Sequence, residues 1–320
     1  MTAMTVRFWG ARGSHPVSGE RYVRYGGNTL CVEIRAGDNL LILDAGTGII
    51  ELGRDLMARS AQAGKPIHAT ILFSHMHHDH TQGFPFFVPA YVGTTHLNMY
   101  GPGIFAQDLE ETLAKTMLPP VFPVSLQELP AVKNISSIRE TDVLLLGEQV
   151  GGAVLRNRFH DNTTDIEPDI LQIRTLRSYA HPGGVLIYRI EWQGTSVVYA
   201  TDTEGYVNTD RRLVEFAKNA DVLIHDAQYT EEHYLGKVPN VGATQGWGHS
   251  TPAMACDVAK AANIKQLILF HHDPRYGDDV VARNEADAKA LFANAQAAYE
   301  GLVLTLDASE PVQDEAGQNH

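Results

Sequence analysis

The sequence predicts an α/β protein folded as a four-layer αββα sandwich. Apolar, strand-like runs occur in two sets along the chain, and each set also contains helix-like segments. Histidine and aspartate side chains stand where several of these runs end, so the two sets are expected to meet at one site. If each half contributes a sheet and a layer of helices, and the sheets face each other, four layers result.

The first half is expected to contain four strands and one helix. Each predicted strand is a short apolar run bounded by glycine or polar residues. The strands are Val6–Trp9, Cys31–Ile34, Leu40–Leu43 and Ala69–Phe73, and the helix is Ile49–Ser60. An Asp-x-Gly-x-Gly turn begins at Asp44 between the third strand and the helix, and its glycines permit the positive φ that a tight turn can require.

The second half repeats this organisation. Its predicted strands are Val185–Ile190, Ser196–Ala200, Asp221–His225 and Leu267–Phe270, and its helices are Arg211–Asn219 and Thr251–Ala262. Ser250 or Thr251 is a suitable N-cap for the last of these helices, and Pro252 suits its first turn.

An insertion at about 101–150 is expected between the halves. It contains an amphipathic segment, Ile104–Met117, followed by residues 118–124, which are too rich in proline for a central strand. The insertion either covers the core or forms a lid or homodimer contact above the site. Residues 1–306 are predicted to form a single domain, and the polar, acidic tail 307–320 is predicted to be disordered.

Composition indicates a cytoplasmic globular protein. Of the 320 residues, 44% are hydrophobic and 20% charged, which is ordinary for a chain with a sizeable core. No apolar run approaches the length of a membrane span, and the chain enters a strand at Val6 without a signal-peptide pattern. Two cysteines, Cys31 and Cys256, provide neither a disulfide framework nor a paired metal motif.

The net charge of −13 bears on the class of partner. Binding to a long polyanion depends on clusters of lysine and arginine that neutralise phosphates. The densest basic stretches, such as Arg156/Arg158 and Arg211/Arg212, are pairs rather than blocks. A large nucleic acid is therefore disfavoured as substrate, whereas a small anion is not.

The most informative motif is HxHxDH, which directly follows the strand ending at Phe73. It comprises His75, His77, Asp79 and His80. These spacings do not share one face of a helix, but they suit a strand end that opens into a tight loop. Imidazole and carboxylate ligands together fit Zn²⁺, with Mn²⁺ or Fe²⁺ as alternatives.

Three further candidate ligands stand at other strand-to-loop junctions. His181 precedes the strand Val185–Ile190, Asp202 follows Ser196–Ala200, and His271 follows Leu267–Phe270. With the motif they make seven groups, enough for two divalent metal ions with one shared carboxylate. A two-metal site of this kind activates water for hydrolysis.

This order of ligands is that of the metallo-β-lactamase superfamily, which the sequence resembles over nearly its whole length. The segment Gly248-His249-Ser250-Thr251 resembles the branch that contains RNase Z and related phosphodiesterases. The resemblance implies the αββα fold, two metal ions and hydrolase activity.

The resemblance also implies a role for each residue. One metal would be held by His75, His77 and His181, and the other by Asp79, His80 and His271, with Asp202 bridging. His249 would contact the scissile phosphate and assist the leaving group, and Asp79 would also accept a proton. His272 stands next to His271, and the sequence leaves open which of the two is the ligand, although His271 is preferred.

The remaining histidines are expected to be structural. His78 is predicted to point away from the metals, and His225 to be buried and hydrogen-bonded. Asp44, Asp226 and His225 are candidates for orienting the ligands.

The expected function is hydrolysis of a small phosphodiester such as a cyclic nucleotide. The alternatives are an RNase Z-like endoribonuclease and a lactonase or β-lactamase-type hydrolase. Long-arm RNase Z enzymes carry a Gly/Pro-rich excursion that clamps tRNA, and the sequence has no clear equivalent. A flavodiiron oxidoreductase would require a carboxylate where His77 stands. A non-catalytic metal scaffold is disfavoured because the ligand set is complete.

Overall fold

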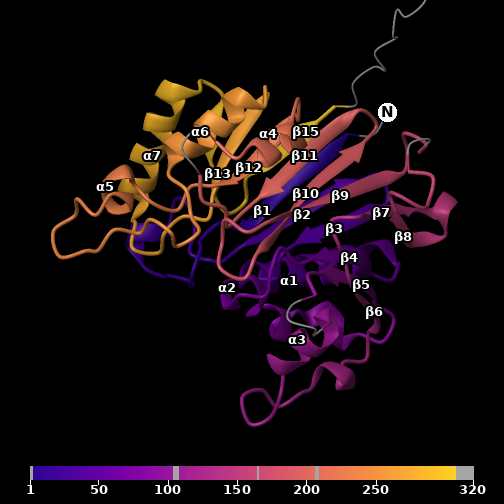
Figure 1. Cartoon of the computed structure of the whole chain (residues 1–320). Helices are drawn as coiled ribbons and strands as arrows, with labels where there is room; N and C mark the ends of the chain where they lie inside the picture. The colour runs from indigo at the N-terminus through magenta and orange to yellow at the C-terminus, as the bar shows by residue number, and fades with distance from the viewer. Residues whose placement is uncertain (1–2, 104–107, 164–165, 206–208, 308–320) are drawn as a thin grey trace, which may run out of the picture.

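The computed structural model describes residues 3–103, 108–163, 166–205 and 209–307. Two large β-sheets face each other, and helices cover their outer surfaces (Figure 1). Buried residues of both sheets form the inner core, among them Leu41 and Leu43 on one side and Tyr188 and Ile190 on the other. The predicted four-layer αββα sandwich is confirmed.

The first sheet has the strand order β15-β1-β2-β3-β4-β5-β6. Its strands are β1 (Met4–Gly10), β2 (Cys31–Ala36), β3 (Asn39–Leu43), β4 (His68–Leu72), β5 (His96–Gly101), β6 (Val132–Ser137) and β15 (Val303–Leu306). The associated helices are α1 (Gly48–Ala63), α2 (His78–Thr81) and α3 (Leu109–Lys115). The pairs from β3 to β6 are parallel, and the other pairs are antiparallel.

The second sheet has the order β14-β13-β12-β11-β10-β9-β7-β8. Its strands are β7 (Asp142–Gly147), β8 (Gly152–Asn157), β9 (Leu171–Ser178), β10 (Val185–Trp192), β11 (Thr195–Ala200), β12 (Val222–Asp226), β13 (Gln266–Phe270) and β14 (Ala295–Ala297). Its helices are α4 (Arg211–Ala217), α5 (Glu231–Tyr234), α6 (Pro252–Ala261) and α7 (Asp278–Leu291). The pairs from β11 to β14 are parallel.

The helices pack through their apolar faces. Helix α1 buries Ile49, Leu52 and Leu56 against the first sheet, in a core separate from the one between the sheets. Helix α6 begins as the sequence predicts: the Thr251 hydroxyl accepts a hydrogen bond from the backbone N–H of Met254, and Pro252 occupies the first turn. An N-cap and a buried face together fix where this helix starts and how it lies.

The segment 101–150 differs from the expected insertion. Its later part supplies β6 at the edge of the first sheet and β7 within the second, so the segment carries the chain from one sheet to the other. The sequence reading missed β6 because the strand is half-exposed, with few apolar residues. The predicted helix Ile104–Met117 corresponds to α3, and its first residues, 104–107, lie outside the described part of the chain.

Two other expectations concern the C-terminal tail and membrane-spanning segments. Of the predicted tail 307–320, residues 308–320 lie outside the described ranges. Across the described residues, no helix combines the length and apolar character needed to span a bilayer.

Parallel strands place the candidate site. In the first sheet β3 and β4 run side by side, with Leu43 opposite Leu72. In the second sheet Ala200 on β11 is opposite His225 on β12, and Asp226 is opposite Phe270 on β13. Because neighbouring parallel strands end at the same edge, the residues that follow them come together there.

Candidate metal centre

The HxHxDH motif spans the loop after β4 and the single turn of α2. His75 is buried in the loop, whereas Asp79 and His80 lie on α2, which begins at His78. The motif was expected to be a tight loop throughout. The helical turn instead sends Asp79 and His80 toward the interior and leaves His78 exposed, as predicted for that residue.

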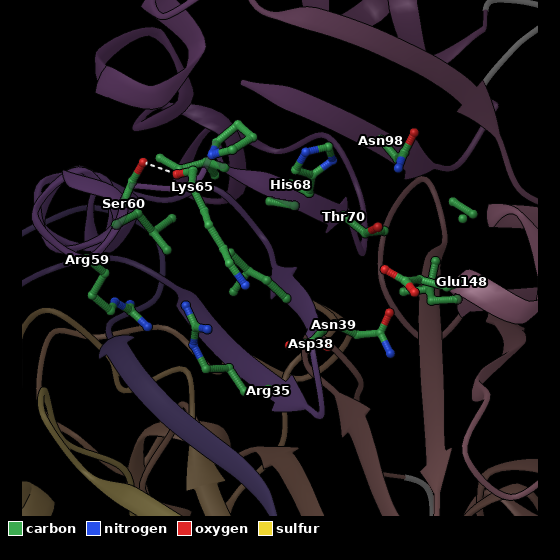
Figure 2. Close-up of a pocket in the computed structure, with 18 of the residues that line it drawn as sticks. Arg35, Asp38, Asn39, Arg59, Ser60, Lys65, His68, Thr70, Asn98 and Glu148 are labelled. Carbon is green, nitrogen blue, oxygen red and sulfur yellow. Dashed lines mark hydrogen bonds between the residues drawn. The ribbon is translucent and has the colours of Figure 1, made fainter. Parts of the chain in front are cut away.

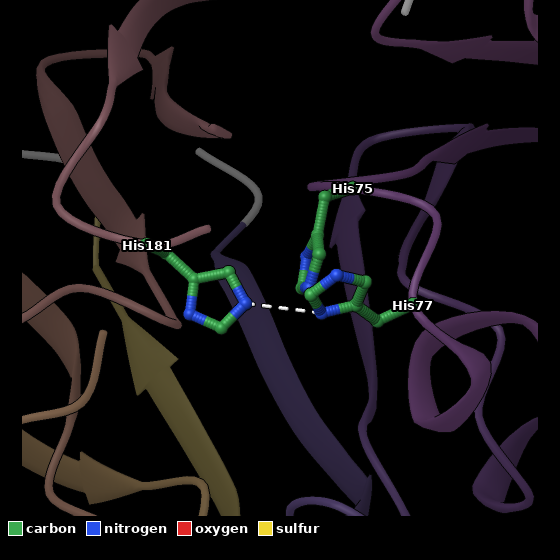
Figure 3. Close-up of side chains that lie close together, drawn as sticks. All are labelled: His75, His77 and His181. Atoms are coloured by element: carbon green, nitrogen blue, oxygen red, sulfur yellow. Dashed lines mark hydrogen bonds between the residues drawn. The ribbon is translucent and has the colours of Figure 1, made fainter. Parts of the chain in front are cut away.

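His75, His77 and His181 form the first ligand group. Their rings point toward one another from both halves of the sandwich (Figure 3). One nitrogen from each ring lies within 4.8 Å of the others, and His181 Nε2 is 3.0 Å from His77 Nδ1. Tetrahedral zinc with bonds of 2.0–2.1 Å implies ligand nitrogens about 3.3 Å apart, so this group fits such an ion.

Asp79, His80 and His271 form the second group. His271 Nε2 is 3.3 Å and His80 Nε2 is 3.5 Å from the same oxygen, Asp79 Oδ2. The same oxygen accepts a hydrogen bond of 2.7 Å from the backbone N–H of Ser14. One carboxylate and two imidazoles therefore face a common point at the end of β13.

Asp202 lies between the two groups. Its Oδ1 is 3.2 Å from His80 Nε2 and 3.3 Å from His271 Nε2. Its Oδ2 faces the first group, 3.7 Å from His75 Nε2 and 3.8 Å from His181 Nε2. This is the arrangement that a bridging carboxylate requires.

The protonation chemistry of the first group also fits a cation. Burial lowers the pKa of His75 and brings the pKa of His181 to about 4, so both imidazoles are neutral near pH 7. Neutral imidazole is the metal-binding form. Within the described residues, the buried Nε2 atoms of His75, in the first group, and His80, in the second, have no hydrogen-bond partner. Buried polar atoms are rarely left unpaired, and a bound cation would supply the partner that these nitrogens lack.

The carboxylates are held in their charged form. Burial would raise the pKa of Asp79 and of Asp202, but the imidazoles of His80 and His271 outweigh it and both pKa values are lowered. Burial likewise opposes a raised pKa at His271, yet the carboxylates, with Asp202 foremost, raise it to about 9. The polypeptide thus presents a dense set of anionic and imidazole donors, which suits divalent ions.

Backbone strain concentrates at this edge of the sheets. Asp44, Asp202 and His271 follow strands β3, β11 and β13 with φ of 58°, 52° and 64°. Left-handed conformations are uncommon for residues other than glycine, though Asn, Asp and His adopt them more readily than most. Strain of this kind is kept where the surrounding structure enforces it, often at functional sites.

Asp44 orients His80, as predicted. Its Oδ2 is 2.8 Å from His80 Nδ1 and accepts hydrogen bonds from the hydroxyls of Tyr199 at 2.7 Å and Ser74 at 2.8 Å. Because an ionised carboxylate can only accept hydrogen bonds, Nδ1 of His80 carries the proton. Nε2 of His80 then faces Asp79 and Asp202.

Two glycines allow the backbone to approach the histidine rings. A Cβ on Gly13 would lie 2.2 Å from the ring of His271, and a Cβ on Gly248 would lie 2.4 Å from the ring of His181. The Gly248 carbonyl is 3.2 Å from His181 Nδ1. Both glycines are therefore required by close packing against candidate ligands.

His249 lies beside both groups and is held by Asp226. Its Nδ1 is 2.7 Å from Asp226 Oδ2, and its ring stacks on His271 with centroids 4.8 Å apart. The His181 ring lies 4.9 Å away. The structure thus brings the predicted leaving-group histidine to the ligand cluster.

His271 and His272 face in different directions, and only His271 faces the other candidate ligands. His271 faces Asp79 and Asp202, whereas Nε2 of His272 is 3.0 Å from the carbonyl of Ala298, away from the cluster. Burial lowers the pKa of His272 to about 3. His225 is buried and its Nδ1 is 2.7 Å from the Asp226 carbonyl, so its predicted structural role also holds.

Sequence reasoning missed Glu204. Its carboxylate accepts hydrogen bonds from the backbone N–H groups of Gly246 and Gly248 and from the hydroxyl of Tyr234, at 2.7–2.9 Å. These contacts fix the loop that carries His249. No spacing pattern connects Glu204 with that loop, so the sequence held no signal for it.

The profile of the beta-lactamase superfamily domain matches residues 39–272, which contain every candidate ligand and His249. The chain belongs to the beta-lactamase superfamily. It is a metal-dependent hydrolase of this superfamily, as its sequence indicates.

Relatives within the superfamily include ribonuclease Z of Bacillus velezensis. It is 25% identical over 261 residues, which cover 75% of this chain and 81% of the relative. Among solved structures, the metallo-beta-lactamase fold protein YhfI from Bacillus subtilis has a TM-score of 0.64 at 19% identity, covering 95% and 99% of the two chains. The short form of human tRNase Z has a TM-score of 0.58 at 19% identity, with the same coverage. At these identities the structural likeness shows the shared fold.

Proposed function

We propose that this superfamily member is a phosphodiesterase that binds two divalent ions, with zinc as the preferred metal. One ion would be held by His75, His77 and His181, and the other by Asp79, His80 and His271, with Asp202 between them. The observation that carries the proposal is the pairing of His249 with Asp226 beside this double cluster. Phosphodiester cleavage needs a proton donor for the leaving oxygen, and a positioned histidine provides one.

When bound, such ions polarise phosphoryl oxygens and activate water for attack. The protein's own side chains accept and donate the protons. Asp79 would accept a proton, and the backbone N–H of Ser14 fixes the orientation of its carboxylate. His249 is held through Nδ1, which leaves Nε2 to donate a proton to the leaving oxygen, and Asp226 stabilises the imidazolium.

A small nucleotide diester, such as a cyclic nucleotide, is the substrate that we favour. Tyr179 and Trp247 stand two residues before His181 and His249, and their side chains are 74% and 62% exposed. Exposed aromatic rings next to a phosphate-binding centre can stack on nucleobases. The net charge of −13 disfavours a long polyanion, which gains affinity from clustered cations.

An RNase Z-like endoribonuclease is the second candidate, and the relatives favour it. Ribonuclease Z of Bacillus velezensis matches three quarters of this chain, and the human neighbour is a tRNase Z. A diphosphatase of the PhnP family also shares the fold, with a TM-score of 0.57 at 16% identity. Phosphodiester hydrolysis covers both the small-diester phosphodiesterase and the endoribonuclease. The two candidates differ in the size of the substrate.

A substrate panel tests the proposal. Metal-analysed protein is assayed with 3′,5′- and 2′,3′-cyclic nucleotides, bis-p-nitrophenyl phosphate, precursor tRNA, a lactone and nitrocefin. We expect turnover of the diesters, with a KM for the small ones that changes little between about 50 and 200 mM salt, an interval over which polyanion affinity falls steeply. Efficient, salt-sensitive cleavage of precursor tRNA would select the endoribonuclease. Preference for the lactone or nitrocefin would refute the phosphodiesterase.

A further inference from the structure

A cavity of about 520 Å³ opens at the end of the sandwich remote from the candidate metal centre. It is lined by the starts of β3 and β4, where Asn39 and His68 stand, and by the turn between β7 and β8, which contributes Glu148. The metal-centre residues follow the opposite ends of β3 and β4. The cavity is therefore separate from the candidate metal centre, and residues of both sheets line it. Its volume lies in the range of small-molecule sites.

Three cationic side chains converge on one side of this cavity. Figure 2 shows the head groups of Arg35, Arg59 and Lys65 gathered there, contributed by β2, α1 and the loop before β4. Within the described part of the chain, the Lys65 ammonium has no hydrogen-bond acceptor or ion-pair partner.

A buried carboxylate holds the two guanidinium groups in place. Glu33 Oε1 accepts hydrogen bonds from Arg35 Nε at 2.7 Å and Arg59 Nη1 at 2.8 Å, and Glu33 Oε2 accepts one from the indole of Trp9 at 2.9 Å. Burial would raise the pKa of Glu33, but its bonds to the arginines outweigh burial and lower it. The carboxylate is thus charged and engaged by three donors. Arg59 also pairs with Asp55. Among the described residues, the Nη1 and Nη2 groups of Arg35 have no hydrogen-bond or ion-pair partner.

An amide and a carboxylate, both of which can accept hydrogen bonds, line the other side of the cavity. The side chains of Asn39 and Glu148 lie across the cavity from the cationic group (Figure 2). A carboxylate accepts hydrogen bonds from hydroxyl groups, and an amide both donates and accepts them. A ligand that bridges the cavity would therefore be anionic at one end and hydroxylated at the other.

We propose that this cavity is a binding site for a phosphate monoester with a hydroxylated body, such as a sugar phosphate. Arg35 presents its remaining guanidinium N–H groups to the phosphate oxygens, and Arg59 and Lys65 add positive charge. Glu148 and Asn39 bind the hydroxyl groups. The site does not depend on the reaction at the metal centre. Ligand binding there ties the β7–β8 turn to the first sheet.

Isothermal titration of the intact, metal-loaded chain with ribose 5-phosphate tests the proposal. The variant is Lys65→Gln, which removes an exposed charge on a loop and leaves the Glu33 network intact. The matched control is Arg54→Gln, which removes a cation on α1 that pairs with Glu51 and does not line the cavity. Any heat from phosphate binding at the metal centre is common to the three proteins, so differences between isotherms report the cavity.

We expect a binding event in the wild-type chain and in Arg54→Gln that weakens roughly tenfold or more in Lys65→Gln, as expected for loss of a hydrogen bond to a charged group. Glu148→Gln should weaken the binding of ribose 5-phosphate but not the binding of inorganic phosphate. Ribose without phosphate should not bind. Identical isotherms for the wild type and Lys65→Gln would overturn the site. Equal affinity for inorganic phosphate and ribose 5-phosphate would overturn the assignment of a hydroxylated ligand.

Discussion

The Asp226 carboxylate fixes the ring of His249 through a contact of 2.7 Å between Oδ2 and Nδ1. Its other oxygen, Oδ1, accepts hydrogen bonds from the backbone N–H groups of Ser250 at 2.8 Å and Gln228 at 3.1 Å. Asp226 ends β12, so the carboxylate is anchored by a central strand and by the loop that carries His249. The histidine is thereby held in one tautomer and one orientation beside the ligand cluster.

Replacing His249 by alanine should lower kcat for phosphodiesters by roughly 10²–10⁴, the range expected for loss of a general acid. Metal content should be unchanged, because His249 belongs to neither of the two proposed ligand groups. The exposed His78→Ala is the matched control and should keep wild-type turnover. Steady-state kinetics and elemental analysis of the same preparations check both statements. Wild-type kcat in His249→Ala would exclude the role.

Replacing Asp202 by asparagine should reduce metal content at both positions. Asparagine tolerates the φ of 52° at this position, so the change removes the charge without adding the backbone strain that alanine would cause. About two ions per chain are expected in the wild type, by the logic of two-metal sites. Elemental analysis after exhaustive dialysis gives the stoichiometry. Two ions retained in Asp202→Asn would show that the carboxylate does not bridge.

Replacing Gly13 by alanine should displace His271, because the new Cβ would lie 2.2 Å from its ring. We expect loss of metal from the second group and a large fall in kcat, with secondary structure preserved. Gly242→Ala is the control, since a Cβ there has no atom within 4 Å. Metal content and circular dichroism of the two variants provide the comparison. A fully loaded, active Gly13→Ala protein would contradict the packing argument.

Replacing Trp247 by leucine should raise KM for nucleotide diesters with little change in kcat. Loss of one base–aromatic stack corresponds to about 1–3 kcal/mol, or roughly a 5–150-fold change. Phe159, which is 68% exposed and lies just after β8, provides the control in Phe159→Leu. Kinetics with a cyclic nucleotide separate KM from kcat. An unchanged KM in Trp247→Leu would remove the stacking argument for a nucleotide substrate.

The sequence by itself determined which side chains are candidates for the metal centre. The HxHxDH spacing and the positions of His181 and Asp202 at strand-to-loop junctions named the donors, because strand ends are where a sheet presents side chains. The alternation of strands and helices in two sets also determined the sandwich. These features depend on local pattern, which a single chain displays directly.

The tertiary structure alone decided which of His271 and His272 faces the other candidate ligands, and which contacts hold each side chain in place. His271 adopts φ 64° after β13, which turns its ring toward Asp79 and leaves His272 facing Ala298. Glu204 and the loop at Gly248 are brought together by folding, and so are the side chains that converge on the remote cavity. Such contacts join residues distant in the chain, and their direction depends on backbone dihedrals and packing that no sequence spacing encodes.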